Sequence, residues 1–284
     1  MCLTLLVSGA GQANAGLLYG LSTDAPTSGL YTIDPNTGAA TLLLSLPYRT
    51  NPSGLTFLNG QLSASNVAVD SSGRRQTGTI DLQTGMFTAI SDQGGSTSWH
   101  GLAGNNAANV LYTAEGGNTG LFSVTPTGVI TGVGYPGLPA LGLEYDNKHG
   151  ILYAVTVDPF YTIDVVTGAA TSIGPTGIGF SARVGLAYDE DNDILYANAT
   201  RQFAPSTPLV HQLFRVDVHT GAFTLVGNNG LDVTIDGLAW GPAAAPVPAP
   251  STLTLVSLGI LGLLGYNWRR RRWPRGGVGF AGRT

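Results

Sequence analysis

The chain has 284 residues, a formal net charge of −4 and 11% charged residues, and its body has no basic patch of the kind that binds nucleic acid. Cys2 is the only cysteine, which excludes disulfide frameworks and cysteine-ligated metal sites in the rest of the chain. The 41 glycines and 16 prolines, together with many Thr, Val, Leu and Tyr residues, favour short strands joined by tight turns over disorder.

Residues 1–15 have the features of the end of a secretory signal peptide. Leu3 to Val7 form an apolar stub, and Ala13-Asn14-Ala15 is a small-x-small cleavage site. A basic n-region is absent and the apolar core is short, so we expect the true start of the signal to lie upstream of Met1. The alternative is an ordinary disordered N-terminus. The first interpretation predicts an exported protein.

Three sequence elements recur five times in residues 16–242. The first is an apolar residue followed by Asp-x-x-Thr-Gly, at 33–38, 80–85, 163–168 and 216–221, with a degenerate copy at 124–128. The second is Gly-Leu, starting at Gly54, Gly101, Gly142, Gly185 and Gly237. The third is Leu-Tyr or a variant, starting at Leu18, Leu62, Leu111, Leu152 and Leu195. Such a repeat, with a period of about 45 residues, predicts one structural unit arrayed many times.

The unit between residues 142 and 174 is the clearest. Its pattern predicts four strands, at 142–145, 151–156, 160–163 and 169–173, and four antiparallel strands per unit make the blade of a β-propeller. The chain begins with a second strand at 17–21 and ends with a lone first strand at 236–240, so joining them completes a fifth blade. We therefore predict an all-β, five-bladed propeller over residues 16–242. Six blades are the alternative if an upstream segment is missing.

The acidic residues of the first element occupy one repeat position. These residues are Asp34, Asp81, Asp164 and Asp217. An aspartate there can accept hydrogen bonds from backbone N–H groups two or three residues on, and the final glycine adopts a positive φ at little cost. We interpret them as turn residues rather than catalytic carboxylates.

The repeat resembles the blades of quinoprotein-dehydrogenase-like and lactonase-like propellers, in which Asp-x-x-Thr-Gly turns are common. The tryptophan that follows this turn in many quinoprotein blades is absent, since the chain continues as 39–41 Ala-Ala-Thr, 86–88 Met-Phe-Thr and 222–224 Ala-Phe-Thr. The resemblance covers the blade only, and we expect no cofactor.

The search for metal and catalytic motifs gives two candidates. The segment 189–193 has alternating acids like the start of a calcium loop, with Asp189, Asp191 and Asp193 as candidate ligands. Ile194 and Thr200 stand where such a loop has its glycine and its final glutamate, so a solvated hairpin turn is the favoured interpretation and a weak calcium site the alternative. His100, His149, His211 and His219 show no zinc-ligand spacing.

The second candidate consists of residues that precede the repeated Gly-Leu. Because equivalent repeat positions lie at equal depth around the channel, Ser53, His100 and Asp236 could ring one level of it. This cluster is a hypothesis for a binding or hydrolytic centre, and a polar plug at the channel mouth is the alternative.

The C-terminal 42 residues have three consecutive parts: a Pro/Ala linker at 243–250, a charge-free apolar segment at 251–268, and a basic tail at 269–284 that opens with Arg269, Arg270, Arg271 and Arg272. An 18-residue helix spans roughly 27 Å, close to the ~30 Å hydrocarbon core of a bilayer. We predict a transmembrane helix with its arginines in the cytoplasm and residues 1–250 across the membrane. The alternative is a buried helix of the soluble domain.

This order of parts resembles the C-terminal sorting signal of PEP-CTERM proteins, which have a Val-Pro-Glu-Pro-like motif, a short apolar helix and an arginine cluster. The motif here is Val247-Pro248-Ala249-Pro250, with Ala249 at the glutamate position, and the chain continues twelve residues past Arg272. The resemblance implies a bacterial protein that is exported, held in the inner membrane by its tail, and processed by an exosortase for release to the cell surface or beyond.

From these features we expect a non-catalytic surface or extracellular-matrix protein whose propeller binds an unidentified surface ligand such as a polysaccharide. The alternative is a lactonase-like or glycan-active hydrolase that uses the channel mouth. A third possibility is a purely structural array without a ligand.

Overall fold

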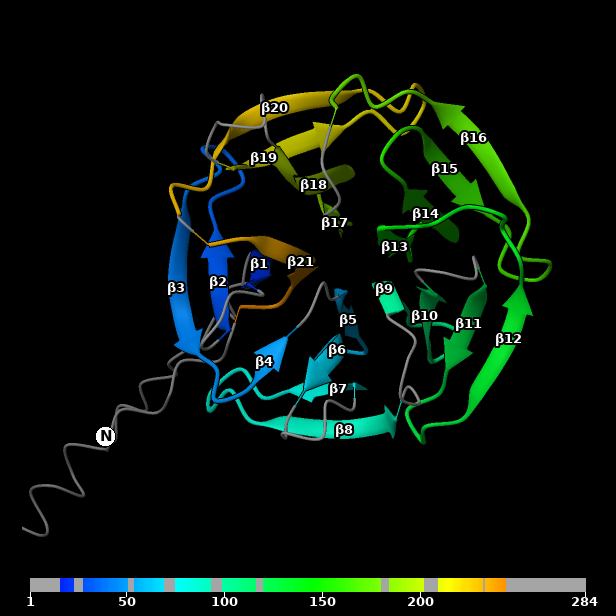
Figure 1. Ribbon diagram of the computed structural model, residues 1–284, viewed down its shortest axis with the longest axis horizontal. Helices are drawn as coiled ribbons and strands as arrows, with labels where there is room; N and C mark the ends of the chain where they lie inside the picture. The colour runs from blue at the N-terminus through cyan, green and yellow to red at the C-terminus, as the bar shows by residue number, and fades with distance from the viewer. Residues whose placement is uncertain are drawn as a thin grey trace, which may run out of the picture. The chain divides into compact units, whose positions relative to one another are not determined.

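The computed structural model describes residues 16–22, 28–50, 54–68, 75–92, 99–115, 120–179, 184–201, 209–231 and 233–243. These residues form five antiparallel sheets arranged around one axis (Figure 1). The predicted all-β propeller is therefore confirmed, with five blades rather than six. The predicted signal peptide, sorting motif, transmembrane helix and arginine tail lie outside the described residues. Within the described part of the chain, no helix has the length and apolarity needed to cross a membrane.

Each blade has four strands, which run outward from the axis. Blade I contains β21 (Ile235–Gly241), β1 (Leu17–Ser22), β2 (Gly29–Ile33) and β3 (Ala40–Ser45). Blade II contains β5 (Leu55–Leu58), β6 (Gln61–Ala68), β7 (Gln76–Ile80) and β8 (Phe87–Asp92), and the short β4 (Arg49–Thr50) also pairs with β6. Blade III contains β9 (Trp99–Asn105), β10 (Val110–Glu115), β11 (Leu121–Val124) and β12 (Ile130–Gly134).

The last two blades follow the same plan. Blade IV contains β13 (Gly142–Asp146), β14 (Ile151–Val155), β15 (Phe160–Ile163) and β16 (Ala170–Gly174). Blade V contains β17 (Val184–Asp189), β18 (Ile194–Arg201), β19 (Val210–Val216) and β20 (Phe223–Asn228). The strands of blade IV match those predicted from its sequence to within one residue.

The ring closes by pairing the last strand with the first. In blade I the C-terminal β21 is the inner strand and pairs antiparallel with β1, with Leu18 opposite Trp240 and Gly20 opposite Leu238. The Tyr19 hydroxyl donates to the Pro242 carbonyl at 2.7 Å, just after β21 ends. This closure is the one predicted, and it leaves no unpaired inner strand.

The Asp-x-x-Thr-Gly segments form the predicted turns. In blade IV the Asp164 carboxylate accepts from the Val166 and Thr167 amides at 2.8 Å each, and the Gly168 amide donates to the Asp164 carbonyl at 2.8 Å. Gly168 has φ +74°, which glycine adopts without strain. Backbone and threonine donors hold the pKa of Asp34, Asp81, Asp164 and Asp217 below its ordinary value. These acids are structural, as predicted.

The Gly-Leu elements are explained by the axis. The glycines let the inner strands approach: a Cβ on Gly54 would lie 2.1 Å from the Leu102 nitrogen, and one on Gly185 would lie 2.6 Å from the Asp236 carbonyl oxygen. The leucines that follow them fill the centre, and the described residues there leave no room for a water molecule. The middle of the axis is a packed plug of leucines rather than an open channel.

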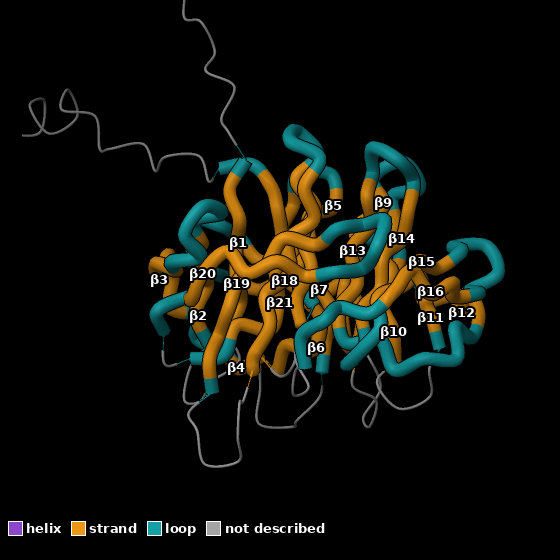
Figure 2. Tube along the Cα trace, turned by 90° about the horizontal axis from the view of Figure 1, so that it is seen from above, coloured by secondary structure: helices purple, strands orange, loops and turns teal. Residues whose placement is uncertain are grey.

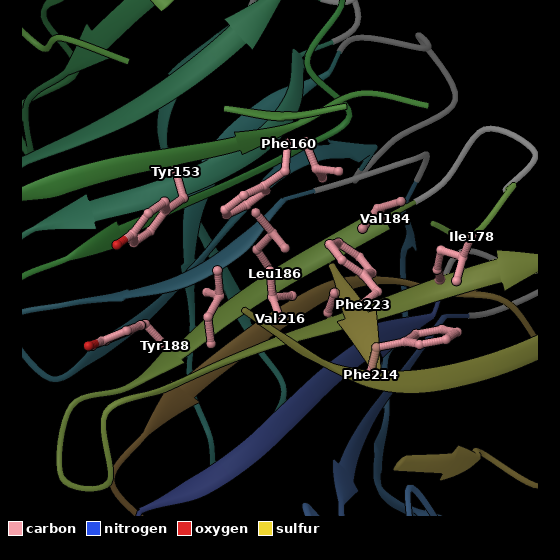
Figure 3. Packing of buried hydrophobic residues seen from close by; sticks show 13 residues of the cluster. Tyr153, Phe160, Ile178, Val184, Leu186, Tyr188, Phe214, Val216 and Phe223 are labelled. Atoms are coloured by element: carbon pink, nitrogen blue, oxygen red, sulfur yellow. The ribbon is translucent and has the colours of Figure 1, made fainter. Parts of the chain in front are cut away.

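Between neighbouring blades the core is apolar and aromatic. Figure 3 shows this core at blades IV and V, where Phe160, Phe214 and Phe223 lie among aliphatic side chains of β17 and β19. The rings of Phe160 and Phe223 meet edge to face, with centroids 6.4 Å apart. Inner strands such as β17 are buried along their whole length, whereas outer strands such as β16 are largely exposed. Stability therefore comes from the contacts between blades and falls off toward the perimeter.

The two ends of the propeller differ in their connections. One end holds the hairpin turns 59–60, 106–109, 147–150 and 190–193, and we call it the turn face (Figure 2). The opposite end, where the inner strands begin, is the loop face. Blade I has no hairpin between its two inner strands, because β21 ends and β1 begins there. Gly16 and Pro242 therefore lie at the turn face.

Candidate functional site

A cavity of about 250 Å³ lies at the turn face, where the inner strands end. We call it the turn-face pocket. All five blades contribute to its lining, with Trp240 from blade I, Phe57 from blade II, Asn106 from blade III, Glu144 from blade IV and Asp191 from blade V. A site that every blade builds is a natural place for function in a propeller, because the ring holds its parts rigidly.

Glu144 is the most unusual residue of this pocket. It lies in β13 and is only 7% exposed. Its Oε1 accepts a hydrogen bond from the Tyr188 amide at 3.2 Å, whereas its Oε2 has no hydrogen-bond partner among the described residues. Burial raises the pKa of Glu144 well above its ordinary value, and the nearby Glu190 and Asp146 carboxylates raise it further. An unsatisfied buried carboxyl group costs stability, so it marks a site of possible use.

The repeat explains why Glu144 stands out. In each inner strand one residue follows Gly-Leu, and the five are Thr56, Ala103, Glu144, Ala187 and Ala239. Four of these positions hold a small residue, and only blade IV places an acid there. Sequence reasoning missed this residue, although the break in the repeat was the signal that could have found it.

The aromatic side of the pocket depends on two glycines. A Cβ on Gly16 would lie 2.4 Å from the Trp240 Nε1, and a Cβ on Gly241 would lie 2.3 Å from the Phe57 ring. Glycine at both positions therefore lets the backbone of blade I lie directly against the two rings. The indole of Trp240 is also held by Tyr196, whose ring stacks on it at a centroid distance of 6.1 Å.

A belt of asparagines links the turns of blades II, III and IV. The Asn59 amide donates to Asn106 Oδ1 and the Asn106 amide donates to Asn147 Oδ1, each at 2.7 Å. The Asn147 side chain then donates to the Gly104 carbonyl at 3.0 Å. Because these bonds run from blade to blade, they fix the rim of the pocket on three of its sides.

The three candidate calcium ligands have separate roles. The Asp189 carboxylate accepts from the Asp191 and Asn192 amides at 3.1 Å and thus caps its own turn. Asp193 accepts from the Tyr188 hydroxyl and pairs with Lys148 at 3.4 Å, whereas Asp191 lines the pocket. In the described ranges no three His, Cys, Asp or Glu side chains form a group that could hold a metal ion.

The structure places the other predicted cluster at the opposite end of the axis. His100 in β9 is half-buried and Asp236 in β21 is 4% exposed, and both strands flank β5 in the inner ring. Ser53 lies outside the described residues. The bulges fall at Gly101 in β9 and at Asp236 in β21, so the two side chains differ in register by one residue. The leucine plug separates this end from the turn-face pocket.

Comparisons with known proteins bear on the tail and on the fold. Residues 246–272 match the family model described as PEP-CTERM protein-sorting motif. No curated protein matches the chain. Among solved structures, the crystal structure of a nidogen/laminin complex is similar with a TM-score of 0.53 and 12% identity, covering 81% of this chain and 99% of that chain. At that identity the likeness supports the propeller fold alone. The chain thus combines a five-bladed β-propeller with a PEP-CTERM protein-sorting motif at its C-terminus.

Proposed function

We propose that this chain is an exported protein, anchored in the membrane by its C-terminal segment and sorted to the cell surface, and that its propeller is a non-catalytic binding module. The sorting motif at 246–272 is the single observation that supports the first part, because such a motif implies export and exosortase processing. The predicted transmembrane helix at 251–268 and the stop at Arg269 to Arg272 fit the same route.

The turn-face pocket supports the second part. It has a defined volume, a rigid rim and one buried carboxyl group with an unused oxygen, which are features of a ligand site. The described chain also starts and ends beside this pocket, since Gly16, Gly241 and Pro242 line it. On this proposal the binding site and the origin of the tether share one face of the propeller.

Hydrolysis is the second candidate function. A buried carboxyl group whose pKa is raised can act as a general acid, and Glu144 in a pocket with Glu190 and Asp191 has that character. On this alternative, Glu144→Gln removes turnover of a glycan or lactone substrate while binding persists.

The sorting proposal is tested in a host that contains an exosortase. We expect the full chain to lose its tail, with a matching drop in mass, and to reach the cell surface, whereas a chain ending at Ala245 stays soluble in the periplasm. Replacing Arg269 to Arg272 with alanine should leave the tail uncleaved or mislocalised. Equal solubility of the full and shortened chains in the periplasm would overturn the proposal.

The residue Ala249 offers a finer control. Because the family pattern has glutamate at this place, Ala249→Glu should raise the fraction of processed chain. Processing that is unchanged by Ala249→Glu but lost with the arginine variant would show that the arginine cluster, rather than the acidic position, sets recognition here.

A further inference from the structure

We propose that the turn-face pocket binds a primary ammonium group carried by a small hydroxylated ligand, such as an unacetylated amino sugar. This inference rests on the pocket being the ligand site of the proposed function and names the chemistry of its ligand. Glu144 is the buried counter-ion, and the aromatic rings of blades I and II form the opposite side.

The charge of the lining carries the first step. Glu144, Glu190 and Asp191 all line the pocket, and no lysine, arginine or histidine is among its described lining residues. Lys148, on the next turn, is engaged by Asp193 at 3.4 Å. A concave site lined by one sign of charge attracts a ligand of the opposite sign. The ligand should therefore be cationic.

The unused oxygen of Glu144 carries the second step. Oε1 already accepts from the Tyr188 amide, and Oε2 is buried without a hydrogen-bond partner in the described structure. An ammonium group supplies the missing donor and a positive charge in one contact, and a charge-assisted bond of this kind is about twice as strong as a neutral one. The cost of burying this carboxyl group in the empty protein is then offset when the ligand binds.

The aromatic residues distinguish an organic ammonium from a metal ion. Phe57 and Trp240 line the same cavity as the carboxylates, and ring faces attract ammonium groups while offering no ligand to a hard metal ion. The cavity of about 250 Å³ is larger than a single ion requires and suits a small organic group. The amide-rich rim around Asn106 provides partners for hydroxyl groups.

The test uses the full chain in detergent and measures binding by calorimetry at pH 7. The probes are glucosamine, glucose as the neutral match, N-acetylglucosamine as the acylated match, and calcium chloride. We expect glucosamine to bind with a dissociation constant tighter than about 10 mM and at least tenfold more tightly than either neutral sugar. Glu144→Gln, which keeps the shape and the acceptor for the Tyr188 amide, should weaken glucosamine at least tenfold.

Asp81→Asn is the matched control, because it removes one acid from an exposed turn of blade II outside the pocket, and it should bind glucosamine as the wild type does. If Glu144→Gln does not fold, Glu190→Gln on the exposed turn replaces it, with a smaller loss expected. The proposal is overturned if glucose binds as tightly as glucosamine, if calcium displaces glucosamine, or if no probe binds. These outcomes leave the sorting assay untouched, so failure of the ligand assignment and failure of the sorting proposal are distinguishable.

Discussion

The two ends of the propeller axis are closed in different ways. At the turn face the inner strands end around a polar cavity with a buried acid, Glu144, whose Oε2 has no partner in the described structure. Toward the loop face, buried amides join one blade to the next: Asn198 in β18 donates to the Ile235 carbonyl at 2.7 Å and accepts from Asn229 at 2.7 Å. Polar groups at the loop face are satisfied and structural, whereas the turn face keeps one in reserve.

This difference shows how a repeat can gain a site. All five blades share the Gly-Leu element that closes the axis, so the scaffold tolerates little change there. The next residue faces fewer constraints, and a single exchange from a small residue to Glu144 in blade IV gives one end of the axis a distinct chemistry. The following predictions break or sharpen this contrast between a fixed axis and a variable end.

The largest expected effect comes from the axis itself. Gly54→Ala places a Cβ 2.1 Å from the Leu102 backbone nitrogen, where no flexible side chain can move away. We expect a loss of about 3 kcal/mol or more in the free energy of unfolding, measured by chemical denaturation. Gly132→Ala is the control, because a Cβ there meets nothing within 4 Å and the change should be nearly neutral. Similar losses for both would contradict the packed axis.

The next effect concerns the loop-face amide. Asn198→Ala leaves the Ile235 carbonyl and the Asn229 side chain without their shared partner inside the core. Losing a buried hydrogen bond with its partners left in place costs about 1–3 kcal/mol, which should appear as a lower denaturation midpoint. Asn36→Ala, on an exposed turn, is the control and should change the midpoint little. A neutral Asn198→Ala would mean that this end is not fixed by its amides.

A pH experiment sharpens the contrast at the turn face. Because the folded pKa of Glu144 lies above its ordinary value of 4.5, the folded state binds the extra proton, and stability falls as the pH rises from about that value through the raised pKa. The groups that face it are the Glu190 and Asp146 carboxylates, Asp191 across the pocket, and the Tyr188 amide. Glu144→Gln should flatten this decline in unfolding free energy. A decline that persists in the variant would assign it to another group.

The same linkage applies to ligand binding. A bound ammonium group favours the charged form of Glu144, so binding should release a proton, and the affinity for glucosamine should rise with pH until Glu144 is ionised in the free protein. Calorimetry in two buffers of different ionisation enthalpy measures this release directly. Binding without proton release would contradict the role of Glu144 as the counter-ion.

The extent to which the sequence predicts these features follows from their range along the chain. The turns at Asp34 and Asp164 depend on residues within five positions, so strands, blade count and closure could be inferred from the repeat. The pocket depends on which residues of five distant units meet at the axis, and a single chain segment holds no sign of that. The acids of 189–193 show the limit: their spacing suggested one ion site, yet the hairpin sends Asp189 into the turn and Asp193 toward Lys148.

The smallest effect is expected at the exposed turns. Blade III already forms its turn without an acid, because the Thr125 hydroxyl accepts from the Val129 amide at 3.1 Å where the other blades use aspartate. Asp81→Asn keeps an acceptor oxygen for the Gln83 and Thr84 amides, so we expect only a slight drop in unfolding temperature at pH 7. The pKa of Asp81 lies below its ordinary value of 3.8 in the folded state, so its stabilising charge is present above that pH and lost as the pH falls through the lowered pKa. The difference between variant and wild type should therefore vanish in acid, opposite in sign to the effect at Glu144. A difference that grew as the pH fell would mean that Asp81 is not held by its turn donors.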